Sequence, residues 1–119
     1  MIQARDVPVY PGATHAETHR AALQRGHMST DEHAVDASPA DVVAFYVERL
    51  GPPSEPQPGG GAKWLFEETT ERPDEVGRTK VLVSVAPRKD GGTTLLIGTT
   101  SSTGRRATFW GALRALFGR

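Results

Sequence analysis

The stretch KWLFEETTERPDEVGRTKVLVSVAPRKDGGTTLLIGTT, residues 63–100, decides the fold. It holds three runs rich in β-branched and aromatic residues, KWLFEETT, TKVLVSVAP and TTLLIGTT, and two turn-rich segments separate them. This pattern predicts an antiparallel meander of three strands. Because side chains alternate across a strand, the large apolar residues can share one face, which we expect to be the core. They are Trp64, Phe66, Val81, Val83, Val85, Leu95 and Ile97.

The opposite face of the meander carries one leucine on each strand: Leu65, Leu82 and Leu96. Polar residues such as Glu67 and Lys80 flank them. If the three leucines lie together they form a small apolar patch, and contiguous exposed apolar surface usually indicates an interface. We therefore expect these leucines to belong to an interaction surface.

A helix is predicted over residues 39–50. Ser38 is a good N-cap, Pro39 suits the first helical position, and Gly51 followed by two prolines ends the run. One arc of this helix is apolar, so it should lie on the core face of the sheet, while Phe45 sits off the arc and should meet a further element. The arc consists of Val42, Val43, Tyr46, Val47 and Leu50.

The segments on either side of this helix are less regular. Pro8, Pro11 and Gly12 predict an extended lead-in. Residues 15–36 fit either a capped helix or two strands that turn near Arg25 and Gly26, and we favour the strands. Residues 51–62, GPPSEPQPGGGA, have the composition of a mobile loop or a crossover. A pocket beneath this loop would make the protein a small-ligand binder.

Together these elements predict an α+β fold. We expect a two-layer sandwich, in which an antiparallel sheet of about four strands carries one helix packed across one face, with an extra C-terminal amphipathic helix. Residues 1–104 should form the α+β domain. Residues 105–119 should form the tail helix, docked on the domain or on a partner.

The predicted tail helix has a bulky apolar face and a basic character. Its basic residues are Arg105, Arg106, Arg114 and Arg119, and residues 105–119 contain no acidic residue. Three destinations for it remain open: the chain's own sheet, an anionic membrane surface, and a groove on another protein or on a second copy. The large apolar residues are Phe109, Trp110, Leu113, Leu116 and Phe117.

Composition limits the function classes. A chain of 119 residues suits one domain, and its 14 basic and 14 acidic residues balance, so we expect no nucleic-acid partner. The absence of cysteine excludes disulfides and thiolate chemistry but leaves the compartment open. Neither a long apolar run nor a signal peptide is present. We expect a soluble protein, cytoplasmic or envelope-associated.

The sequence contains only weak signals for catalytic or metal-binding groups. His15 and His19 would share a helix face as metal ligands do, but in a strand their spacing places them on one face and about 13 Å apart. Glu67 and Glu68 are adjacent in a strand, so they point to opposite faces and cannot form an acid–base pair. We therefore expect no metal, no cofactor and no catalytic residue, and hence no enzyme.

Four segments, VPVYPGAT, DASPADVVAFYVERL, KWLFE and TTLLIGTT, together resemble small bacterial domains of uncharacterised function that often occur in envelope proteins and lipoproteins. The resemblance covers residues 6–100 and consists of the YPGA segment and the helix pattern SPxxVVxFYxxxL. It implies an envelope location and brings no catalytic residues. The chain departs from these domains in lacking a lipobox cysteine and in its arginine-rich tail.

The resulting functional prediction is a non-catalytic binding or assembly module. It would act through the apolar surfaces of the sheet and the tail helix, with a protein partner or by self-association. The alternatives are a peripheral membrane-associated domain that uses the basic tail helix, and a small-ligand binder.

Overall fold

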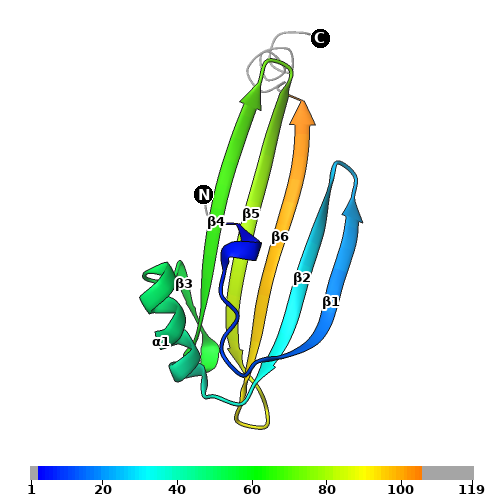
Figure 1. The fold of residues 1–119 in the computed structure, drawn as a ribbon. Coiled ribbons are helices and arrows are strands. Elements are labelled where there is room, and N and C mark those ends of the chain that lie inside the picture. The colour runs from blue at the N-terminus through cyan, green and yellow to red at the C-terminus, as the bar shows by residue number, and fades with distance from the viewer. Residues whose placement is uncertain (1–2, 106–119) are drawn as a thin grey trace.

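A computed structural model of the chain describes residues 3–105. Its centre is a six-stranded antiparallel sheet with the strand order β1-β2-β6-β5-β4-β3 (Figure 1). One α-helix, α1 (Pro39–Leu50), and two 3-10 helices, η1 (Ala4–Asp6) and η2 (Pro58–Gly60), accompany the sheet. The strands are β1 (Thr14–Leu23), β2 (Gly26–Val35), β3 (Glu55–Gln57), β4 (Gly61–Arg72), β5 (Glu75–Pro87) and β6 (Thr93–Arg105).

The fold is therefore mostly β, and the predicted sheet of about four strands is wrong. Residues 15–36 do form two strands, as favoured, and both belong to the same sheet as the predicted meander. The short β3 arises inside the proline- and glycine-rich segment, where Pro56 argues against a strand because it cannot donate into a ladder. The predicted C-terminal helix lies outside the described residues, except that Arg105 ends β6 instead of starting a helix.

Helix α1 has the bounds that the sequence predicts. The Asp41 N–H donates to Ser38 Oγ over 3.3 Å, and Gly51 closes the helix with a φ of +85°. Val42 and Tyr46 are fully buried in the same core cluster as Trp64 on β4. Val47 is 40% exposed, so the prediction that it lies on the buried side of the helix is wrong. The predicted core residues of the meander are buried, with Phe66 only partly so.

The N-terminal segment crosses the same face of the sheet as α1 (Figure 1). Val7 is buried in the core, and Phe45 meets Tyr10 at a ring-centroid distance of 5.0 Å, which confirms that Phe45 contacts a further element. The segment begins with η1, whose three residues are too few to show a period in the sequence. We call this the covered face of the sheet and its opposite the open face.

The outer hairpin of β1 and β2 contains a β-bulge. The pairing register shifts between His15 and Glu17, so His15 lies opposite His33 while His19 lies opposite Thr30. An inserted residue reverses the alternation of side chains beyond it, which places His15 on the covered face and His19 on the open face. The prediction that these two histidines share one face is therefore wrong.

The sheet is longer than the elements that cover it. Strands β4, β5 and β6 have 12, 13 and 13 residues, and the principal extents of the molecule are 58, 25 and 25 Å. Helix α1 lies against the end nearer the β5–β6 turn, and the core reaches no further than Val81 and Ile97 (Figure 1). Toward the β4–β5 turn the same face is polar, with Thr70 and Thr103.

Candidate binding surfaces

The open face brings the three predicted leucines together. Leu65 lies directly opposite Leu82, while Leu96 lies opposite Ser84, two residues along β5 from Leu82. Side chains at such positions are neighbours on a sheet face. Leu65 is 45% exposed, and the other two leucines are partly exposed. The leucines therefore form one apolar patch that centres on β5.

Within residues 3–105 no element covers the open face. Among the strand positions that point to this face, only two glycines of the described residues are buried, Gly61 and Gly98. A Cβ atom at Gly98 would lie 2.6 Å from Thr30 Oγ1, so the backbone at this point passes close beneath the neighbouring strand's side chain. The surface beside Leu82 is therefore recessed, because Gly98 has no side chain and Thr30 has a short one.

Ion-paired side chains flank the leucines on both sides. On the β4 side, Lys63 Nζ lies 3.3 Å from Glu55 Oε1. On the β1–β2 side, His19 Nε2 lies 3.4 Å from Glu32 Oε1 and 3.8 Å from Glu17 Oε2. The pairing register places Lys63, Glu32 and Glu17 in the cross-strand row of Leu96. Glu55 on β3 lies in the same row, which therefore runs from the paired Glu55 and Lys63 at one side of the sheet to Glu32 and Glu17, beside His19, at the other.

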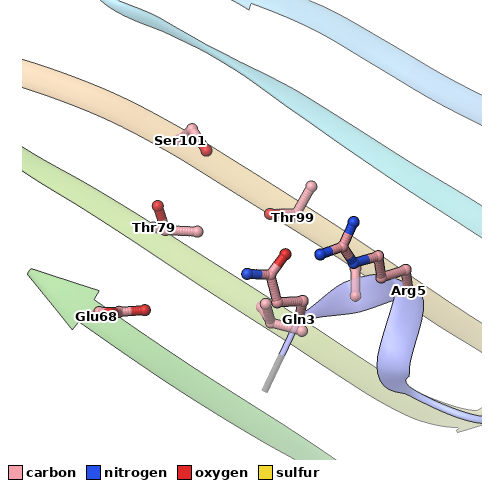
Figure 2. Close-up of a pocket in the computed structure, with 8 residues that line it drawn as sticks. Gln3, Arg5, Glu68, Thr79, Thr99 and Ser101 are labelled. Carbon is pink, nitrogen blue, oxygen red and sulfur yellow. The ribbon is translucent and has the colours of Figure 1, made fainter. Parts of the chain in front are cut away.

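A second candidate site is a pocket of about 390 Å³ on the covered face, between η1 and the central strands (Figure 2). Its floor belongs to two neighbouring cross-strand rows of β4, β5 and β6. Figure 2 shows Gln3 and Arg5 extending from η1 over β5 and β6, with Glu68 on β4 at the far side. The lining consists of Gln3, Ala4, Arg5, Glu68, Thr79, Val81, Thr99 and Ser101.

The charged side chains and the floor hydroxyls of this pocket have no partner among residues 3–105. Within the part of the chain that the structure describes, neither Arg5 nor Glu68 forms an ion pair, and the hydroxyls on the floor form no hydrogen bond. Those hydroxyls belong to Thr79, Thr99 and Ser101. The site therefore offers a cation, an anion and three groups that can both donate and accept.

A cluster of titratable groups lies near the start of β1. His33 is 9% exposed, its ring lies edge-on to His15 at 5.4 Å, and its Nδ1 has no hydrogen-bond partner in residues 3–105. Burial, reinforced by His15, lowers the pKa of His33. Thr18 Oγ1 donates to Asp31 Oδ1 over 2.6 Å, which lowers the pKa of that carboxyl. His15 Nε2 lies 2.8 Å from Thr18 Oγ1.

This cluster does not form a metal centre. No group of three or more histidine, aspartate or glutamate side chains within residues 3–105 is placed to hold a metal ion. The bulge separates His15 from His19, so the pair that the sequence suggested is divided between two faces. Glu67 and Glu68 also lie on opposite faces, as predicted, because they pair with Lys80 and Thr79.

The remaining predicted surface residues are not described. Phe109, Trp110, Leu113, Leu116 and Phe117, with Arg106, Arg114 and Arg119, all lie beyond residue 105, so the tail surface stays a prediction. The loop 51–62 contains β3 and η2, and the pocket beside η1 lies elsewhere. Sequence reasoning missed this pocket, since its residues are ordinary polar residues spread from position 3 to position 101.

Comparisons with known proteins return no match among family models, curated proteins or solved structures. They lend no support to the resemblance to envelope and lipoprotein domains. Among residues 3–105, no helix has both the length and the apolar character to cross a membrane.

Proposed function

We propose that the protein is a non-catalytic assembly module that binds a second copy of itself through the open face. The observation that carries this proposal is the pattern of the face: a leucine patch centred on β5, with the Lys63 cation on β4 and the Glu17 carboxylate on β1 in one cross-strand row. Apolar patches of this kind are typical of interfaces, and unlike charges at the sides of a patch can meet in a symmetric pair.

The pattern is self-complementary about a two-fold axis that lies between the two open faces and runs parallel to β6. β6 is the middle one of the five long strands, so this axis exchanges β4 with β1 and β5 with β2. Leu96 then meets the partner's Leu96, and Leu82 lies over the recessed surface at the partner's Gly98 and Thr30. In the row of Leu96, Lys63 meets the partner's Glu17.

The size of the face suits a stable dimer. Five strands spaced about 4.8 Å apart and about ten residues long cover about 800 Å². Standard protein interfaces bury about 800 Å² on each partner. Two sheets that stack face to face also form the ordinary core of a β-sandwich, so this association needs no rearrangement of either copy.

Sedimentation velocity on the full chain over a range of concentrations tests the proposal. We expect a concentration-dependent dimer, and we expect Leu82→Asp to shift it to monomer because a carboxylate would be buried at the centre of the contact. Val9→Asp is the matched control, since Val9 is 47% exposed but lies outside the open face. A monomer at every concentration overturns the proposal.

A charge reversal tests the two-fold geometry separately. Lys63→Glu should weaken the dimer because it places two carboxylates opposite each other. Adding Glu17→Lys should restore it, because each contact again pairs unlike charges. A double variant that dimerises no better than Lys63→Glu alone would show that these two residues do not meet.

A further inference from the structure

The pocket beside η1 is independent of the open face, because it opens on the other side of the sheet. We propose that it binds a short peptide with free ends, a dipeptide or tripeptide, with Arg5 holding the carboxylate and Glu68 the ammonium group. The two charged side chains, the hydroxyls between them and the spacing of the strands carry this inference.

The charges are placed for a ligand that carries both signs. Arg5 and Glu68 have no ion-pair partner in residues 3–105, although they line the same pocket. A guanidinium group binds a carboxylate through two parallel hydrogen bonds, and a carboxylate accepts from an ammonium group. A ligand with one charge only would leave the other residue of the pair without a partner.

The spacing selects the length of the ligand. Glu68 is on β4, while Arg5 extends toward Thr99 on β6, and these strands are separated by β5 (Figure 2). Two strand spacings amount to about 10 Å. In a free amino acid the two charged groups are attached to one carbon, so they cannot reach both sides. An extended chain advances about 3.3–3.6 Å per residue, so a dipeptide or tripeptide spans about 7–11 Å.

The floor suits a peptide backbone better than an apolar molecule. Thr79, Thr99 and Ser101 present three hydroxyls between the charged ends, and each can donate to a carbonyl and accept from an N–H. Val81 supplies the one large apolar side chain of the floor. A separate pocket of about 240 Å³ lies further along the same face and is lined in part by Thr70 and Thr103.

Titration of the labelled full chain with the dipeptide alanyl-alanine, followed by amide chemical shifts, tests the proposal. We expect saturable shifts at residues 3–5, 68, 79, 99 and 101. N-acetyl-alanyl-alanine lacks the ammonium group and alanyl-alanine amide lacks the carboxylate, so each should bind at least about tenfold more weakly, which corresponds to about 1.4 kcal/mol. Equal binding of all three compounds, or no shift in this set, overturns the proposal.

Two variants assign the ends of the ligand. Arg5→Gln should abolish the preference for the free carboxylate, and Glu68→Gln should abolish the preference for the free ammonium group. The matched controls are Arg78→Gln and Glu67→Gln, whose side chains lie on the open face. The dispersed amide spectrum of each variant reports that it is folded. Identical losses in variants and controls would show that overall charge, and not the pocket, attracts the peptide.

Discussion

Tyr46 on α1 donates a hydrogen bond of 2.7 Å to the backbone carbonyl of Pro8. The bond joins the helix to the N-terminal segment that carries η1, and thus to the wall of the pocket. Burial raises the pKa of Tyr46 to about 12, so the hydroxyl keeps its proton and remains a donor at neutral pH.

Tyr46→Phe should lower the free energy of unfolding by about 1–3 kcal/mol, because the Pro8 carbonyl would lose its partner in a partly buried place. Urea denaturation measures this change. Tyr10→Phe is the control, since in residues 3–105 the Tyr10 hydroxyl donates no hydrogen bond and the ring contact with Phe45 is kept. If both variants lose the same amount, the hydrogen bond is not the cause.

Gly26 and Gly104 both lie in strands and should respond differently to alanine. A Cβ atom at Gly26 would lie 1.9 Å from the Ser101 carbonyl oxygen, whereas a Cβ atom at Gly104 meets nothing within 4 Å. Gly26→Ala should therefore destabilise the protein by about 1–3 kcal/mol through overpacking. Gly104→Ala should be neutral or stabilising by up to about 1 kcal/mol, because it restricts the unfolded chain. Thermal denaturation of the pair distinguishes these outcomes.

His33 should make stability depend on pH. Its pKa in the folded protein lies below the ordinary 6.5, because of burial and of His15, with Asp31 acting in the opposite direction. As the pH falls below about 6.5 the unfolded chain binds more protons than the folded protein, so the free energy of unfolding decreases until the folded pKa is passed. The pKa of Asp31 is lowered from 3.8, mainly by the hydrogen bond from Thr18. This carboxyl therefore adds a separate decrease in the free energy of unfolding at more acidic pH.

Denaturation series between pH 8 and pH 2 measure both decreases in the free energy of unfolding. His33→Gln should remove the decrease that begins near pH 6.5 and keep the decrease at more acidic pH. His27→Gln, at an exposed position on the same strand, should keep both. An unchanged decline near pH 6 in His33→Gln would assign the dependence to another group.

The parts of the fold that follow local rules could be predicted from the sequence. The α1 boundaries depend on Ser38 and Gly51, which act within a turn of the helix, and the meander core depends on the strict alternation around Val81, Val83 and Val85. The residues 14–35 hairpin was ambiguous for a physical reason: most of β1 is exposed on both faces, so no apolar period identifies it.

The pocket and the exact facing of side chains depend on long-range pairing. The bulge at Ala16 decides which face carries His19, yet alanine carries no signal for a bulge. The leucine patch could be anticipated because each strand contributes one leucine in the alternating pattern. The pocket could not be anticipated, because Arg5 and Glu68 line the same cavity only through the placement of η1 on the sheet.

The long strands project past the elements that cover them, so local opening of the sheet should differ along its length. Near α1 the ladder between β4 and β5 is sheltered by Trp64 and Val83, whereas around Thr70 and Gly77 water reaches both sides of the same ladder. Amide hydrogens at the second position should exchange with solvent sooner than those at the first, although one continuous pair of strands carries both. A single sheet would thus contain a firm base and a fraying tip.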